Sequence, residues 1–427
     1  MRYKGSVIIA FAVLVLILIT YLIPSLKTDN NENRTLATFR MVIHPEKDSI
    51  MYRDSPAERL DAALSDQFAY RETVVTRYMK FFNDTENLVY GIKKYLAGEE
   101  DLQYTFQVIG NYVTIEDTGY LTEYPSTEPL PEDSLKKHID QLTYLHDRYP
   151  DMKMYVYYVT QAYDTSWFDN YIGTTTAGHA REIADALPAY VEFGHLEYRD
   201  LEDYKDIHYK TDHHWNHRGA QRGYENIYAM MRGDFEMGKI RVPVSENPVS
   251  DTYDFRFRGS YARALGDLYQ GSLDDFAFYE YDLPKRETSR IDPRTRQEIP
   301  VETIGLNDEY GRGEIIKTKN NDHYIQMYGT ARDIEGAAYK DSEYPFVIRN
   351  SEGNGRNLLI IGDSYSRAIR DLLASHYSLT VYIDYRVLSV IPVDYVIENY
   401  RIDAVLFGSN TSLWNGDGYF LVFGEED

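Results

Sequence analysis

The sequence contains no cysteine. Disulfides are therefore excluded, and so are thiolate metal ligands, a cysteine nucleophile and lipid attachment through an N-terminal cysteine. With 43% hydrophobic residues, the chain has enough apolar side chains to build a core without covalent links. We therefore expect one large domain, or two smaller ones, stabilised by packing alone.

Runs of basic residues are missing as well, and the formal net charge of the chain is -23. A surface this acidic repels a phosphate backbone and cannot release the counterions that drive binding to nucleic acids. The composition therefore argues against a nucleic-acid partner.

Long hydrophobic runs are absent except for one near the amino end, from Val7 to Ile23, which follows Arg2 and Lys4. Its length of roughly 17 residues is at the short end of a membrane span. A cleaved signal peptide begins in the same way, but residues 20–24 contain no small-residue cleavage pattern, which favours an uncleaved signal-anchor. The basic residues before the run place the amino end in the cytoplasm and the chain from about Leu26 outside.

We expect three parts along the chain. Residues 1–27 form a cytoplasmic tip and a transmembrane signal-anchor, and residues 28–101 form a stalk followed by helices. Residues 102–427 form the main domain. Within it, residues from about 234 to 344 have little helical periodicity, which predicts a loop- and strand-rich insertion over the active-site face.

The main domain has the pattern of an α/β fold. Alternation around Gly110-Asn111 predicts a hairpin at 106–115, and apolar spacing predicts a helix over 134–149 before a strand at 154–159. Near the carboxyl end strands and helices alternate: strand 357–361, helix 365–376, strand 379–383, helix 393–400 and strand 403–407. This alternation predicts a parallel sheet flanked by helices.

A first candidate for chemistry is Ser364, in the run Ile361-Gly362-Asp363-Ser364-Tyr365-Ser366-Arg367, where a buried strand gives way to a helix. In open α/β sheets ligands bind at the carboxyl ends of strands. A helix start also directs main-chain N–H groups at an oxyanion, and Gly362 allows a tight turn. The alternative is that Asp363 or Ser364 only caps the helix, a role that both residue types favour.

A second candidate supplies a base for this serine, in Thr211-Asp212-His213-His214-Trp215-Asn216-His217. Residues two apart in an extended segment project to the same side, so Asp212 can accept a hydrogen bond from one nitrogen of His214. The other nitrogen is then free to take the proton of the serine. His213 points the other way and is the less suitable base.

The same segment allows a metal site as an alternative, because His and Asp residues gather within ten positions: His208, Asp212, His213, His214 and His217. Imidazole and carboxylate ligands suit zinc or another divalent ion. A metal site would leave Ser364 without a purpose, and for that reason we expect a catalytic triad and no metal or other cofactor.

Three further residues are candidates for oxyanion or substrate binding. Asn410 follows the last core strand and offers an amide donor to the oxyanion hole; the alternative is that it only makes a turn. Arg367, one helical turn after Ser364, can contact substrate or pair with a nearby acid. Trp215, beside the histidines, is the third candidate.

Taken together, these motifs resemble the DHHW proteins, named for the tetrad seen here as Asp212-His213-His214-Trp215. That family is similar to the alginate-type polysaccharide O-acetyltransferases built on the SGNH hydrolase fold. Further matches are Glu32-Asn33-Arg34, the segment at residues 66–72, and the Gly-Asp-Ser-Tyr-Ser run. The resemblance spans about residues 32 to 410.

The resemblance implies an SGNH hydrolase-like domain in which Asp212, His214 and Ser364 cooperate in a covalent acetyl-enzyme mechanism. It also implies an exported polysaccharide acceptor and a membrane-bound O-acyltransferase that supplies acetyl groups. Two alternatives remain. One is a carbohydrate acetyl esterase of the same fold, and the other is a non-catalytic carbohydrate-binding surface protein, which 41 tyrosines and 3 tryptophans would suit.

Overall fold

The computed structural model describes these residues of the chain: 39–44, 55–66, 71–97, 106–115, 118–124, 128–166, 178–248, 257–265, 268–275, 277–292, 294–300, 314–317, 323–326, 345–385, 391–415 and 420–424. They form two compact units. The first unit holds the described residues up to 97 together with 106–115 and 260–271, and the second holds those of 118–259 and from 272 onward.

The first unit is built on helix α4 (Arg71–Ala97), with α2 (Phe39–Ile43), α3 (Pro56–Asp66) and α11 (Ser260–Leu265). The expected hairpin is present as β1 (Phe106–Ile109) and β2 (Tyr112–Ile115), and Gly110 makes the turn with φ of 62°. Asn87 of α4 bonds to the main chain of Val108 through both side-chain amide atoms, at 2.9 and 3.0 Å. This unit therefore includes the hairpin and the segment 260–271 as well as the helices before residue 98.

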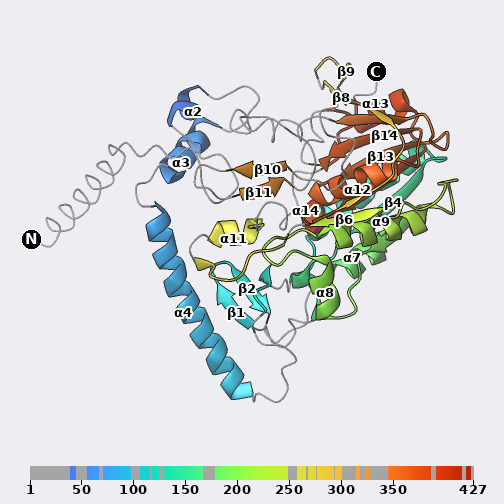
Figure 1. Ribbon diagram of the computed structural model, residues 1–427. Coiled ribbons are helices and arrows are strands. Elements are labelled where there is room, and N and C mark those ends of the chain that lie inside the picture. The colour runs from blue at the N-terminus through green and yellow to red at the C-terminus, as the bar shows by residue number, and fades with distance from the viewer. Residues whose placement is uncertain are drawn as a thin grey trace, which may run out of the picture. The chain divides into compact units, whose positions relative to one another are not determined.

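The second unit is organised by an eight-stranded sheet in the order β5-β4-β15-β13-β14-β12-β8-β9. Strands β5, β4, β15, β13 and β14 run parallel, while β12, β8 and β9 add antiparallel pairs at one side. The bounds are β4 Lys153–Tyr158, β5 Val191–His195, β8 Arg286–Ile291, β9 Glu298–Pro300, β12 Phe346–Asn350, β13 Asn357–Gly362, β14 Leu379–Asp384 and β15 Ala404–Ser409. Figure 1 shows these strands beside their helices.

Two helical layers cover this sheet because its central strands are apolar on both faces. In β13, Leu359 and Ile361 pack into one core and Leu358 and Ile360 into the other, and all four are fully buried. Burial of each such side chain contributes about 1.5–3 kcal/mol. One layer holds α5 (Glu132–Arg148), α7 (His179–Ala186), α13 (Val393–Tyr400) and α14 (Thr411–Asn415), and the other holds α8 (Leu201–Ile207), α9 (His217–Met231) and α12 (Ser364–Ala374).

Shorter elements complete the described part of this unit: β3 (Leu121–Glu123), η3 (Ala162–Asp164), β6 (Ser245–Pro248), β7 (Ala277–Glu280), β10 (Glu314–Lys317) and β11 (His323–Gln326). The predicted insertion at 234–344 does contain many short strands. However, β8 extends the main sheet by antiparallel pairing with β12, and β9 extends it further by antiparallel pairing with β8. Strand β8 has mostly polar residues, so its sequence carries little of the apolar signal by which a core strand is recognised.

The sequence prediction of a mixed α/β fold with a large, mostly parallel sheet flanked by helices is confirmed. Among the described residues, no helix is long and apolar enough to cross a membrane. The signal-anchor that we predict at residues 7–23 lies outside the described residues.

Candidate active site

Ser364 is the first residue of α12, directly after strand β13. Asp363 precedes it in an extended conformation (φ -118°, ψ -157°) and caps the helix, because its carboxylate accepts the Tyr365 N–H at 2.9 Å. Two adjacent residues therefore divide the roles: Asp363 caps the helix, and Ser364 keeps its hydroxyl free of the cap. Asp363 terminates the strand and starts the helix, and Ser364 presents its Oγ at the carboxyl edge of the sheet.

Gly362 serves close packing, and it does not adopt the left-handed backbone that would explain a tight turn. A Cβ at this position would collide with the side chain of Ser366 and would lie 2.8 Å from the carbonyl oxygen of Gly408. The hydroxyl of Ser366 donates to that same carbonyl at 2.5 Å. The start of α12 is thus pressed onto strands β13 and β15, which fixes the height of Ser364 above the sheet edge.

A continuous chain of hydrogen bonds joins Asp212, His214 and Ser364. Nδ1 of His214 lies 2.6 Å from Oδ1 of Asp212, and Nε2 of the same ring lies 2.6 Å from Oγ of Ser364. The main-chain N–H of His214 also donates to Oδ1 of Asp212 at 3.0 Å. This geometry fits a ring that carries its proton on Nδ1 and accepts the hydroxyl proton of the serine at Nε2.

The acid and the imidazole of this series are shielded from water, since Asp212 is 2% exposed and His214 is 6% exposed. His213 is the more exposed of the two adjacent histidines, and its Nδ1 lies 3.6 Å from the carboxylate of Asp212. Its main-chain carbonyl accepts the hydroxyl of Tyr365 at 2.6 Å. The structure therefore brings His214, and not His213, into hydrogen-bond contact with Ser364.

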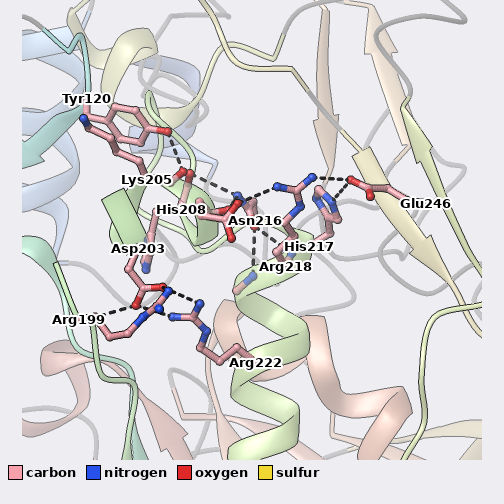
Figure 2. A network of polar contacts seen from close by, with 12 residues as sticks. Tyr120, Arg199, Asp203, Lys205, His208, Asn216, His217, Arg218, Arg222 and Glu246 are labelled. Carbon is pink, nitrogen blue, oxygen red and sulfur yellow. Dashed lines mark hydrogen bonds and ion pairs between the residues drawn. The ribbon is translucent and has the colours of Figure 1, made fainter. Parts of the chain in front are cut away.

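The segment that carries Asp212 and His214 connects α8 to α9, and its far end is held by a polar network. Asn216 caps α9 by accepting the N–H groups of Arg218 and Gly219, and its Nδ2 donates to the carbonyl of Asp206 at 2.8 Å. Arg218 forms ion pairs with both Asp206 and Glu246, and Figure 2 shows Asn216, Arg218 and Glu246 in this network. These contacts fix the start of α9 next to the segment that carries His214.

Trp215 lies in the core, 2% exposed, and not on a binding surface. Its indole ring lies so close to α9 that a Cβ at Gly223 would overlap it. The ring also meets Tyr365 edge-on, with centroids 5.5 Å apart. This placement favours a packing role, in which Trp215 couples the base segment to the helix of the serine.

The histidines at 208, 213, 214 and 217 are close in sequence, but their side chains do not all gather at one point. Nε2 of His208 lies 2.8 Å from the hydroxyl of Tyr198, and burial lowers the pKa of His208 to about 3, so this ring is neutral at physiological pH. His217 turns away to Glu246, at 2.9 Å (Figure 2). Among the described residues, the set able to offer ligand atoms to one ion is Asp212, His213 and His214.

Within this remaining set, Nδ1 of His214 and Oδ1 of Asp212 already bond to each other. An ion between them would displace this bond, while Nε2 of His214 would still be occupied by Ser364. The arrangement therefore suits proton transfer better than metal ligation.

The other two candidates differ in their placement. Asn410 follows β15 and Ser364 follows β13. Because these two strands are neighbours and run parallel, Asn410 and Ser364 lie at the same edge of the sheet. Its Oδ1 accepts the Ser412 N–H at 2.9 Å, and its Nδ2 donor has no hydrogen-bond partner among the described residues. Arg367 instead forms an ion pair with Asp384 at 2.7 Å, and both side chains are largely buried. The structure thus places Arg367 as a support between α12 and β14.

Several residues that the sequence reasoning did not select support this site. Gln161, just after β4, accepts the hydroxyl of Tyr365 at 3.1 Å, and Asp274 holds Thr211 directly before Asp212. Thr211 could have been noticed because it belongs to the Asp-His motif. Asp274 lies 62 positions after Asp212 in a segment with no periodicity, and nothing local to it indicates a role in the site.

Comparisons with known proteins were made at three levels. No protein-family model matches the chain, and no curated protein matches it significantly. Among solved structures, a DHHW family protein from Eubacterium siraeum aligns at 15% identity and a TM-score of 0.51, over 76% of this chain and 99% of that one. Bacillus cereus PatB1 with a sulfonyl adduct aligns at 18% identity and a TM-score of 0.50, over 72% and 98%.

A third structure, the O-acetyltransferase domain of Pseudomonas putida AlgJ, aligns at 10% identity with a TM-score of 0.34, which is too low to support an argument. At the identities of the first two, the likeness is one of fold. The resemblance to DHHW proteins that residues 212–215 and the serine block indicate is thus confirmed at the level of fold.

Proposed function

We propose that the chain is a serine-dependent O-acyltransferase that moves acetyl groups onto a cell-surface or exported polysaccharide. The observation that carries this proposal is the hydrogen-bonded series Asp212–His214–Ser364, with both contacts of the imidazole at 2.6 Å. A buried carboxylate that orients an imidazole, and an imidazole that accepts from a serine at a helix start, are the parts that nucleophilic acyl transfer requires.

In the first half-reaction, Oγ of Ser364 attacks the carbonyl carbon of the acetyl donor while its proton passes to Nε2 of His214. The bond from that carbon to the leaving group then breaks, and the leaving group takes the proton from His214. In the second half-reaction a sugar hydroxyl gives its proton to His214 and attacks the acetyl-serine. Ser364 is released with its proton restored, and Asp212 holds the imidazolium in both halves.

Stabilisation of the oxyanion falls to groups at the carboxyl edge of the sheet. The start of α12 directs main-chain N–H groups and the positive end of the helix dipole toward Ser364. Nδ2 of Asn410 is the side-chain donor that we assign to the same role, because β13 and β15 are adjacent and end side by side.

Hydrolysis is the same chemistry with water as the acceptor, so a carbohydrate acetyl esterase is the alternative enzyme. A carbohydrate-binding protein without catalysis would have no use for the alignment of three polar residues at hydrogen-bond distances. The apolar run at 7–23 supports an anchored, extracytoplasmic location, which favours transfer. A membrane-bound O-acyltransferase would then supply acetyl groups from the cytoplasmic side.

The test is turnover of an activated phenyl acetate by the purified protein. Ser364→Ala should abolish turnover, and His214→Ala should reduce it on the order of 10³-fold or more. Asp212→Ala should retain more activity, because orienting the base matters less than having it. The acetyl group should be found on Ser364 by mass spectrometry of a rapidly quenched reaction.

His213→Ala is the matched control, since it removes the adjacent imidazole and should be milder than His214→Ala. A chelator should leave turnover unchanged, and stoichiometric zinc whose removal abolishes activity would replace the triad with a metal site. Full activity of Ser364→Ala on both the ester and a sugar acceptor would refute the proposed function.

A further inference from the structure

The residue directly before Asp212 is held by a carboxylate from a distant part of the chain. Thr211 is fully buried, and its N–H and its hydroxyl both donate to Oδ2 of Asp274, at 2.9 and 2.5 Å. The N–H of Lys210 donates to Oδ1 of Asp274 at 2.6 Å. One carboxylate thus accepts three hydrogen bonds from two successive residues that lead into Asp212.

This carboxylate is itself fixed in place. Asp274 is 8% exposed and forms an antiparallel bridge with Phe257, with main-chain hydrogen bonds of 2.7 and 3.0 Å. Gly259 lies two residues after Phe257, and its N–H donates to the Thr211 hydroxyl at 2.9 Å. A Cβ on Gly259 would collide with the main chain of Thr211 and with Cβ of Asp212. The backbone at Gly259 therefore lies directly against the Asp212 side chain.

The other side of Asp212 is held by contacts that reach the serine helix. The hydroxyl of Tyr365, next to Ser364, donates to the carbonyl of His213, and the N–H of Tyr209 donates to the carbonyl of His214 at 3.2 Å. The Thr211 contacts hold the chain on the upstream side of Asp212.

We propose that Asp274 and the Thr211 hydroxyl are positioning residues for the triad: Asp274 holds Thr211, and Thr211 sets the distance from the Asp212 carboxylate to His214 and hence from His214 to Ser364. This inference rests on the proposed function, since it assigns a role within the same site. Neither residue contacts the serine, so both act through Asp212. A small displacement of a base from its reacting group lowers the rate steeply, whereas substrate binding need not change.

The test uses Thr211→Val, which keeps the shape but removes the hydroxyl, and Thr211→Ser, which keeps the hydroxyl. In ester turnover by the full chain, Thr211→Val should lower kcat by about 10- to 100-fold with KM within about two-fold. Thr211→Ser should stay within about three-fold of the wild type. Asp274→Asn should behave like Thr211→Val, because its NH₂ group cannot accept from a main-chain N–H.

Asp394→Asn is the matched control. Asp394 is also 8% exposed and also accepts main-chain N–H groups, from Tyr395 and Gly424, but it lies in the helical layer on the other face of the sheet. It should leave kcat within about two-fold of the wild type. If Asp394→Asn lowered kcat as much as Asp274→Asn does, the effect would be one of general stability and the proposal would be wrong.

A second readout does not depend on acyl transfer. The Nδ1 proton of His214, bonded to Asp212, should give a low-field proton NMR signal that Thr211→Val shifts or broadens and Thr211→Ser retains. Unchanged kcat and an unchanged signal in Thr211→Val would overturn the positioning role, even where Ser364→Ala is inactive. If Ser364→Ala were fully active while the signal still responded to Thr211→Val, the proposed function would fail and the geometric coupling would stand.

Discussion

At the scale of single residues, two paired glycines of neighbouring strands matter because of the side chains they lack. Gly362 of β13 pairs with Gly408 of β15, and a Cβ on either would press into the hydroxyl of Ser366. This contact lies two residues from Ser364. The conflict is more severe at Gly362, where a Cβ would also overlap Cβ of Ser366 and press on the main-chain carbonyl of Gly408, so a side chain at position 362 should lift the start of α12 and move the serine with it.

We predict that Gly362→Ala lowers the free energy of unfolding by about 1–3 kcal/mol, the range observed when extra atoms are forced into a packed site. Ester turnover should fall in parallel because Ser364 is displaced. Denaturant unfolding followed by circular dichroism gives the first quantity. Gly233→Ala is the control, because a Cβ there meets nothing within 4 Å, and it should change stability by no more than about 0.5 kcal/mol.

The site residues predicted from the sequence fall into two groups: those that a short-range sequence pattern identifies, and those chosen only because they lie near such a pattern. Asp212 and His214 are two apart, and Ser364 marks a strand-to-helix boundary, so short-range patterns were enough to select them. Arg367 and Trp215 were selected by proximity in sequence, and the structure places one against Asp384 and the other in the core. Sequence spacing does not show which way a side chain turns once a distant strand lies beside it.

At the scale of secondary-structure elements, the segment between α8 and α9 has few apolar residues of its own and takes its shape from contacts made elsewhere in the chain. Asp274 is the clearest case. Its carboxylate is buried, and burial raises its pKa to about 6 from an ordinary value near 3.8, despite hydrogen bonds that act in the opposite direction. Ionisation of Asp274 at neutral pH therefore lowers the stability of the folded state, and the proposed positioning role of Asp274 requires this ionised form.

A pH dependence of stability follows from this raised pKa. The folded state binds the proton more tightly, so the contribution of Asp274 to stability is fully present below about pH 3.8 and is lost as the pH rises to about 6. At about 1.4 kcal/mol for each pH unit, the loss is on the order of 3 kcal/mol. Asp274→Asn removes this term, so the free energy of unfolding of the variant should rise relative to wild type between pH 4 and pH 6.

Urea unfolding of the two proteins at several pH values gives this difference. A difference between wild type and Asp274→Asn that is constant from pH 4 to pH 7 would show that the carboxyl group is not perturbed in this way.

Apolar elements could be predicted from the sequence, whereas a polar strand of the same sheet could not. The strands and helices from residue 357 onward were predicted within one to two residues, because each is short, apolar and bounded by clear turn residues. By contrast, Arg286–Ile291 forms a strand of the main sheet although its residues are mostly polar. Its pairing with β12 depends on a partner some 60 positions away, and no local pattern encodes such a partner.

At the scale of the whole molecule, the absence of cysteine makes the proposed membrane topology directly testable. A single introduced cysteine is the only thiol in the chain, so labelling by a membrane-impermeant maleimide reports one position. In intact cells, Lys136→Cys, on an exposed part of α5, should be labelled, whereas Ser6→Cys, before the predicted anchor, should react only after lysis.

Fractionation accompanies this experiment, and the full-length chain should stay with the membranes. Labelling of Ser6→Cys in intact cells would contradict the assigned orientation. Recovery of an N-terminally trimmed protein from the medium would replace the anchor with a cleaved signal peptide.

The order of the strands has a consequence for how activity first arises during synthesis. Strand β15 follows every other strand of the sheet along the chain, yet it lies between β4 and β13. A nascent chain that has not yet released residues 404–409 therefore lacks the strand that joins β4 to β13, the strand that leads directly into Ser364. Acyl-transfer competence should appear in a single step when β15 inserts, so that a stalled or truncated chain cannot act on donor or acceptor.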